Sequence, residues 1–149
     1  MKQLIFNTAN DWTGLIVRLT FGLILWPHGA QKLFGWFGGY GFEGTMNFFT
    51  GTVHMPWVLG FLVVIIEFFG ALAIIAGLAS RIWGALMIML FIGIIFTSHL
   101  DNGFFMNWFG NQKGEGYEFD LLMIGLSIAI LVNGAGKFSI DGLISKVSK

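Results

Sequence analysis

Cysteine is absent from the 149 residues of this chain. Its absence excludes disulfide bonds, thiolate metal sites and dithiol redox relays that are built from this chain alone. Any electrons that the protein handles must therefore pass through a bound molecule or through a partner protein.

Charged side chains are scarce and balanced. Lysine and arginine together number 8, aspartate and glutamate also number 8, and these four types make up 11% of the residues. The sequence has no run of lysine or arginine, so it lacks the polybasic segment that is typical of a protein that binds nucleic acid or anionic lipid. The composition therefore predicts no nucleic-acid partner.

Hydrophobic residues make up 56% of the chain, and the mean hydropathy is +0.78. Such values are typical of integral membrane proteins rather than of soluble domains. Four hydrophobic segments approach the roughly 20 residues that a spanning helix needs, at about residues 12–34, 57–79, 82–100 and 119–136. We therefore predict an all-α membrane protein, a single domain over residues 1–149, folded in the lipid bilayer as a bundle of four transmembrane helices.

Two stretches outside these segments have patterns of their own. Residues 35–55 are rich in glycine and aromatic residues. We predict that this long connection is an interfacial loop that lies over the bundle. After Ser139, apolar residues recur at i, i+3, i+4 and i+7, which predicts a short amphipathic C-terminal helix along the membrane surface.

The distribution of basic residues predicts the orientation in the membrane. More of them flank one side of the four segments than the other, and the positive-inside rule then places both termini in the cytoplasm. The first residues do not follow the pattern of a cleaved signal peptide, so the first segment is expected to stay as an anchor. The richer side carries Lys2, Arg81, Lys137, Lys146 and Lys149, and the other carries Lys32 and Lys113.

The first hydrophobic segment contains three ionisable residues, Arg18, His28 and Lys32. Successive residues of an α-helix advance by about 100°, so these three positions share one flank. Because ionisable groups are costly in lipid, that flank is expected to face the interior of the bundle. Pro27 has no backbone N–H to donate and predicts a kink one residue before His28.

Glu67 is the one charged residue of the second segment, and it lies about 15 Å from Trp57, near the expected bilayer centre. An unpaired carboxylate at that depth would be costly, and an arginine side chain is long enough to reach it. We predict an ion pair between Arg18 and Glu67. The pair could either fix the register of the helices or relay protons.

Ionisable residues from three helices are expected to meet near the outer membrane face, in a pocket suited to a lipophilic ligand with a polar head. Groups that can exchange protons with such a ligand are candidate catalytic residues, and cationic, acidic or aromatic neighbours are candidate ligand-binding residues. The catalytic candidates are His28, Glu118 and His99, and the ligand-binding candidates are Lys32, Trp26 and Asp101.

Simpler interpretations of these residues stay open. The two histidines could form ordinary hydrogen bonds at the interface, and Glu118 and Asp120 could serve only as acids in the first turn of a helix. Histidines on different helices, His28 and His99, are also compatible with a haem or a metal ion, although their spacing defines no metal site.

A series of short motifs runs along the chain in a fixed order: Arg18-Leu19, His28-Gly29-Ala30-Gln31-Lys32-Leu33, Glu67 followed by Gly70, Gly77 and Arg81, His99, and Gly134-Ala135-Gly136-Lys137-Phe138-Ser139-Ile140-Asp141. Together these motifs resemble the DoxX family, small bacterial and archaeal membrane proteins with four helices. The resemblance extends over about residues 13–144.

The resemblance implies a function. DoxX-like and DoxD-like proteins are associated with a thiosulfate:quinone oxidoreductase and with membrane-bound complexes that handle thiol or oxidative stress. By this resemblance we expect a multi-pass subunit of an oxidoreductase system in the cytoplasmic (inner) membrane of a prokaryote. A quinone would then bind in the polar pocket, and a soluble or membrane redox partner protein would supply electrons. A homo-oligomer is compatible with this interpretation.

Two other functions stay open. Small-residue faces on the helices would suit a non-catalytic scaffold that recruits redox or stress enzymes. Ionisable groups at several depths would suit a pathway for a small molecule or for protons.

Overall fold

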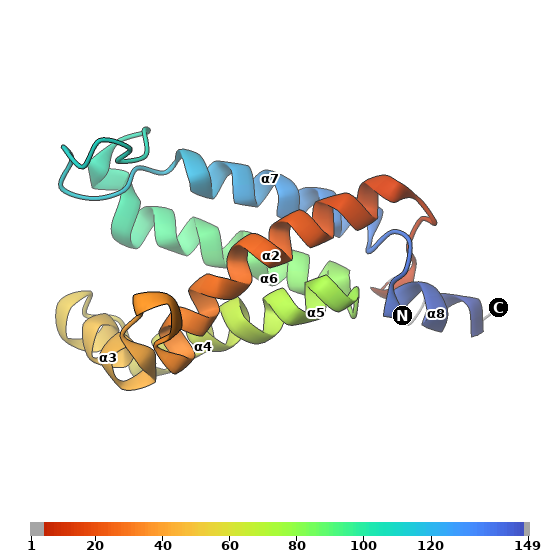
Figure 1. Ribbon diagram of the computed structural model, residues 1–149, viewed down its shortest axis with the longest axis horizontal. Helices are drawn as coiled ribbons and strands as arrows, with labels where there is room; N and C mark the ends of the chain where they lie inside the picture. Colours follow the sequence, from red (N-terminus) through yellow and green to blue (C-terminus); the bar gives the residue numbers. More distant parts are fainter. Residues whose placement is uncertain (1–4, 148–149) are drawn as a thin grey trace.

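The computed structural model describes residues 5–147 (Figure 1). Within these residues the chain is helical and contains no β-strand, so the predicted all-α class is confirmed. The α-helices are α2 (Trp12–Phe34), α3 (Gly41–Asn47), α4 (Trp57–Ile65), α5 (Ala71–Ala76), α6 (Ser80–Ile94), α7 (Glu118–Asn133) and α8 (Ile140–Val147). The 3-10 helices are η1 (Trp36–Gly38) and η5 (Leu100–Asn102), and the π-helical turns are η2 (Phe48–Thr52), η3 (Ile66–Gly70) and η4 (Ile95–His99).

Two continuous helical stretches are long and apolar enough to cross a membrane. Helices α4, η3 and α5 join over Trp57–Ala76, and α6, η4 and η5 join over Ser80–Asn102. Helix α2, with 23 residues, and helix α7, with 16, pack against these stretches. Membrane crossing by α2 and α7, and with it the four-span count, stays a prediction.

Helix α2 begins and ends at residues that suit those positions. The Asp11 carboxylate accepts a hydrogen bond from the Gly14 amide at 2.7 Å, which satisfies one of the free N–H groups of the first turn. At the other end Gly35 adopts the left-handed conformation (φ 74°), and its N–H donates to the Gln31 carbonyl. The helix is continuous through Pro27, so Arg18 and Lys32 lie on one element.

The hydrophobic core lies where α2, α5, α6 and α7 meet. Phe21 and Phe91 pack edge to face there, with ring centroids 6.2 Å apart. On the outer faces, Ile16, Leu23 and Met89 keep about 60% of their surface exposed, as expected of side chains that face lipid. The fully buried apolar side chains include Phe21, Ile74, Met87, Met123, Ile130 and Val64.

The two ends of the described chain lie at the same end of the bundle, which we call the terminal end (Figure 1). Helix α3 and the loop between η5 and α7 lie at the opposite end, which we call the loop end. The connection from residue 35 to residue 56 contains η1, α3 and η2, all at the loop end. Helix α8 extends outward from the terminal end, roughly along the long axis of the bundle, and its predicted contact with a membrane surface stays a prediction.

The terminal end is held together by the side chain of Arg18. Its Nε donates to the Ala135 carbonyl at 2.8 Å, and its Nη1 donates to the Ile75 carbonyl. Its Nη2 donates to the carbonyls of Lys137 and Phe138, at 3.0 and 2.8 Å. One buried guanidinium therefore joins α2 to the end of α5 and to the segment before α8.

The predicted ion pair between Arg18 and Glu67 is wrong. Glu67 pairs instead with Lys32, on the other half of α2. The reason is that the segment after α7 folds over the terminal end and presents three backbone carbonyl groups to the guanidinium, and the Ile75 carbonyl of α5 presents a fourth, so Arg18 needs no carboxylate at the middle of the bundle.

The same segment also caps helices. The Asp141 carboxylate accepts hydrogen bonds from the amides of Ala79 and Ser80, at 2.7 and 2.9 Å, at the start of α6. The Ser139 hydroxyl accepts a bond from the Gly142 amide at 3.1 Å in the first turn of α8. Because Asp141 is 1% exposed, this capping is part of the buried structure of the terminal end.

Candidate functional site

A buried ion pair joins α2 to η3 near the loop end. The Lys32 ammonium lies 2.5 Å from the Glu67 carboxylate. The Glu67 side chain is 3% exposed, whereas that of Lys32 is 27% exposed, so the lysine connects a buried charge to the surface. We call this pair the Lys32–Glu67 centre.

Glycine allows this pair to form. A β-carbon at Gly29 would lie 2.6 Å from the backbone of Phe68 and 2.8 Å from the carbonyl carbon of Glu67, so the two helices touch backbone to backbone. Glu67 itself lies in the π-helical turn η3. Single π-helical turns inside α-helices are frequent at functional sites because they redirect the side chains that they carry.

Aromatic rings cluster around Trp26 of α2 and reach Phe68, the residue after Glu67 in η3. The Trp26 ring lies 6.2 Å from that of Phe68, 6.2 Å from that of Trp36 and 6.4 Å from that of Phe37, measured between centroids. The Nε1 atom of Trp26 is buried and has no hydrogen-bond partner within residues 5–147. A buried donor without a partner costs about 1–3 kcal/mol, which an acceptor on a ligand could recover.

A cavity of about 260 Å³ opens beside Lys32 at the loop end. Thr45 is 5% exposed and lines the cavity, and its hydroxyl makes no hydrogen bond to another described residue. The cavity therefore combines a cation and a free hydroxyl with aromatic walls. Its lining residues are Gln31, Lys32, Gly38, Gly39, Tyr40, Thr45, Phe48 and Phe49.

A second polar centre lies between η4 and α7. The Nδ1 atom of His99 lies 2.6 Å from the Asp120 carboxylate, and Asp120 is 1% exposed. The carboxylate orients the imidazole ring. We call this pair the His99–Asp120 centre. Because Figure 1 shows the end of α2 beside α3 and α4, away from the loop that precedes α7, the two centres are separate.

The expected meeting of all the candidates in one pocket is therefore wrong. His28 is exposed on α2, and no hydrogen bond or ion pair joins it to His99 within residues 5–147. Asp101 is exposed. Glu118 accepts hydrogen bonds from the Met106 amide at 2.9 Å and from Trp108 Nε1 at 3.2 Å, so its carboxylate holds the loop before α7.

Asp120 is the functional candidate that sequence reasoning missed, because it could serve simply as an acid in the first turn of a helix. The spacing of Asp120 relative to the apolar residues of the same segment could have indicated that its side chain is buried. Asp120 is followed by buried residues at i+3, i+7 and i+10, namely Met123, Ser127 and Ile130, so the periodicity of the segment places the carboxylate on the inward face.

The described residues contain no group of three or more histidine, aspartate or glutamate side chains placed to hold a metal ion. The two histidines that were considered as haem ligands belong to different parts of the bundle, and His99 uses its Nδ1 atom for Asp120. The polar groups are therefore arranged as two-residue pairs.

Comparison with known proteins decides the family. The family model of DoxX matches residues 14–100. The chain belongs to the DoxX family. A Bacillus subtilis (strain 168) protein named "Putative oxidoreductase CatD" is 31% identical to it over 143 residues, which are 96% of this chain and 95% of that relative. No solved structure matched the chain.

The DoxX match contains both residues of the Lys32–Glu67 centre but one residue, His99, of the His99–Asp120 centre. Lys32 and Glu67 both lie within residues 14–100, as do Arg18 and His99, whereas Asp120 lies beyond them. The Lys32–Glu67 centre is therefore contained in the part of the chain that defines the family. As a DoxX protein, the chain is a membrane protein related to one that is named an oxidoreductase.

Proposed function

We propose that this DoxX-family protein is a membrane subunit of an oxidoreductase system and binds a quinone, or a similar lipophilic redox molecule, at the Lys32–Glu67 centre. The observation that carries the proposal is the 2.5 Å ion pair between a buried carboxylate and a partly exposed lysine, beside an aromatic cavity of about 260 Å³. Apolar pockets with a few convergent polar groups are typical ligand sites.

The residues of the cavity suit a ring that carries carbonyl oxygen atoms. Lys32 would donate a hydrogen bond to a carbonyl oxygen and stabilise negative charge that develops on it. Glu67 would hold the ammonium in place through the 2.5 Å ion pair. The Thr45 hydroxyl is a free donor in the cavity, and the rings of Phe48 and Phe49 offer apolar contact. The Trp26 N–H, on α2 but outside the cavity lining, is a second free donor.

Reduction of a bound quinone takes up two electrons and two protons. His28 lies one helical turn before Lys32, so it shares that face of α2 and is exposed. We assign proton exchange at the Lys32–Glu67 centre to His28. The His99–Asp120 centre is a second site of proton exchange on the other side of the bundle. Electrons come from a partner protein or a bound cofactor, because the chain has no cysteine and so no dithiol of its own.

The proposal places the protein in the inner membrane of a prokaryote with both termini in the cytoplasm. In this orientation the terminal end faces the cytoplasm and the Lys32–Glu67 centre lies toward the outer face. Three basic residues of the described chain that are near the terminal end support this orientation, namely Arg81, Lys137 and Lys146.

The test is quinone binding by the purified protein, measured by native mass spectrometry in neutral detergent and by organic extraction of protein taken from native membranes. The wild type is expected to retain quinone. Lys32→Gln is expected to weaken quinone binding at least about tenfold, which corresponds to roughly 1.4 kcal/mol for one lost charged hydrogen bond. The matched control is Lys113→Gln, an exposed lysine of the loop before α7, which should bind as the wild type does.

Loss of Lys32 alone leaves Glu67 buried without a partner and could unfold the protein. The double variant Lys32→Gln with Glu67→Gln removes both charges and should restore folding without restoring quinone binding. Equal quinone binding by the wild type and this folded double variant would contradict the proposal.

A scaffold is the second candidate function, and the loop before α7 favours it. Trp108 and Phe109 are 78% and 88% exposed, while hydrogen bonds to Glu118, Glu115 and Asn107 hold the loop that carries them. A rigid, exposed aromatic pair suits a protein partner. If Trp108→Ala with Phe109→Ala abolishes co-purification of redox enzymes and Lys32→Gln does not, the scaffold is the better description.

A further inference from the structure

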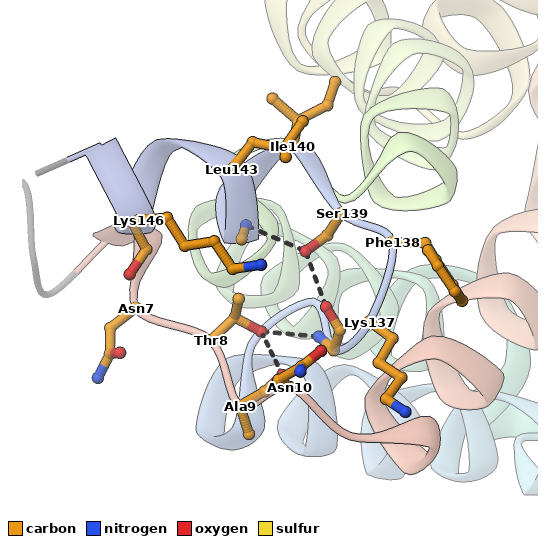
Figure 2. A pocket seen from close by; sticks show the side chains of 13 residues that line it. Asn7, Thr8, Ala9, Asn10, Lys137, Phe138, Ser139, Ile140, Leu143 and Lys146 are labelled. Atoms are coloured by element: carbon orange, nitrogen blue, oxygen red, sulfur yellow. Dashed lines mark hydrogen bonds between the residues drawn. The ribbon is translucent and has the colours of Figure 1, made fainter.

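A larger cavity lies at the terminal end, far from the Lys32–Glu67 centre. Its volume is about 780 Å³, and it is open on one side and lined by residues 7–10, by the segment before α8 and by one side of α8 (Figure 2). Polar side chains from all three parts line it, among them Asn7, Thr8, Asn10, Lys137, Ser145 and Lys146.

The cavity is positively charged. Lys137 and Lys146 line it, and no aspartate or glutamate does. The two nearest acids along the chain are engaged elsewhere: Asp11 accepts from the Gly14 amide, and Asp141 accepts from the amides at the start of α6. Figure 2 shows the Lys146 side chain reaching from α8 toward Thr8, and it forms no ion pair with another described residue. The site therefore attracts an anion.

Two exposed apolar residues of the cavity lining are Phe138 and Leu143, and the Trp12 ring packs against Phe138. Trp12 and Phe138 pack edge to face with centroids 5.9 Å apart, and they are 56% and 80% exposed. The Lys137 ammonium lies 4.4 Å from the centroid of the Trp12 ring. Leu143, on α8, is 65% exposed. Tryptophan with lysine beside it is typical of the interface between membrane and water, where lipid headgroups lie.

We propose that this cavity binds the phosphate-bearing headgroup of an anionic phospholipid from the leaflet at the terminal end. The Lys146 ammonium would pair with the phosphate, and the amide of Asn10 and the hydroxyl of Ser145 would donate hydrogen bonds. The Lys137 ammonium, which lies over the Trp12 ring, would add positive charge to the same region. The acyl chains would extend toward Phe138 and the apolar outer surface of the bundle. This inference does not depend on the proposed function, because it concerns the opposite end of the molecule.

The proposal reverses an expectation from the sequence. Because Lys137 and Lys146 are separated in the chain, the sequence contains no run of basic residues and predicted no binding of anionic lipid. The turn before α8 brings the two lysines to one cavity. A site for a single headgroup requires this local juxtaposition rather than a long polybasic segment.

The experiment is lipid binding by native mass spectrometry, with the full chain in neutral detergent and equal amounts of phosphatidylglycerol and phosphatidylcholine as probes. The wild type is expected to retain phosphatidylglycerol preferentially. Lys146→Gln should reduce that preference about fivefold, as expected for roughly 1 kcal/mol per lysine near a membrane surface. Lys146→Arg, which keeps the charge, and Lys113→Gln, at the loop end, should behave as the wild type.

Three results would overturn the proposal. The first is an equal retention of both lipids by the wild type. The second is an unchanged preference in Lys146→Gln and in Lys146→Gln with Lys137→Gln. The third is displacement of phosphatidylglycerol by millimolar inorganic phosphate, which would identify a site for the free anion. Circular dichroism in neutral detergent without added lipid checks that each variant is folded.

Discussion

The backbone of Gly29 lies against the backbone of Phe68, so that a β-carbon at residue 29 would be 2.6 Å from the Phe68 amide nitrogen. This contact sets the distance between α2 and η3, and with it the 2.5 Å ion pair of Lys32 and Glu67. Backbone atoms cannot yield as a flexible side chain can, so the helices must separate if residue 29 is enlarged.

Gly29→Ala is therefore expected to destabilise the fold by about 2 kcal/mol, the usual cost of forcing an extra methyl group into a packed site. The free energy of unfolding is measured by titration with dodecyl sulfate in mixed micelles. The matched control is Gly125→Ala on α7, where nothing lies within 4 Å of the added atom. Alanine there should be neutral or stabilising by about 0.5–1 kcal/mol. Equal effects of the two substitutions would contradict the role of Gly29.

The two halves of the ion pair are expected to respond unequally to substitution. Lys32→Met leaves the 3% exposed Glu67 side chain without a partner and should cost about 3–5 kcal/mol. Glu67→Gln leaves Lys32, which reaches the surface, and should cost about 1–2 kcal/mol, in the range of a lost charged hydrogen bond. The double variant Lys32→Met with Glu67→Gln should be more stable than Lys32→Met alone.

Unfolding of the two single variants and of the double variant gives the coupling energy directly. Additive effects would mean that the two side chains do not interact in the folded protein.

Arg18→Lys is expected to destabilise the terminal end. The guanidinium donates to four backbone carbonyl groups, whereas an ammonium has three donors and cannot reproduce the planar fork. A loss of about 3 kcal/mol follows if one or two charged hydrogen bonds are not remade.

The measurement for Arg18→Lys is limited proteolysis of the segment between α7 and α8, combined with unfolding in mixed micelles. Cleavage in that segment should become faster than in the wild type. Arg81→Lys is the comparison, because within residues 5–147 Arg81 donates to two carbonyls, those of Asn7 and Leu131. A larger effect at Arg81 would contradict the role assigned to Arg18.

Substitution of His99 is expected to lower the stability of the protein, because Asp120 loses its partner. His99→Gln removes the group that faces the buried Asp120 carboxylate at 2.6 Å and should cost about 3 kcal/mol. His99→Gln with Asp120→Asn pairs two neutral amides and should recover most of that loss. His54→Gln, at an exposed position, is the control and should change stability little.

Glu118→Gln tests whether Glu118, unlike the nearby Asp120, serves to hold the loop before α7. Because Glu118 accepts from the Met106 amide and from Trp108, its variant should speed hydrogen exchange in the loop before α7 while the bundle keeps its stability. Slow exchange of the Met106 amide in Glu118→Gln would show that the loop does not depend on this carboxylate.

The sequence by itself determined the helical class and the family. Uninterrupted apolar runs must satisfy their backbone groups within the segment when they are in lipid, so hydropathy predicts helices without knowledge of their neighbours. The DoxX motifs and the burial of Arg18 and Glu67 could likewise be inferred from local sequence, because an ionisable residue in an apolar run must face protein.

Only the tertiary structure decided which partner each charge has. A shift of one residue along a helix turns a side chain by about 100° and moves it by about 1.5 Å along the helix axis. Small differences in helix position therefore determine that Glu67 pairs with Lys32 and that His99 pairs with Asp120. Three of the four carbonyls around Arg18, and Lys137 of the terminal cavity, come from a folded turn after α7, whose path depends on packing rather than on hydropathy.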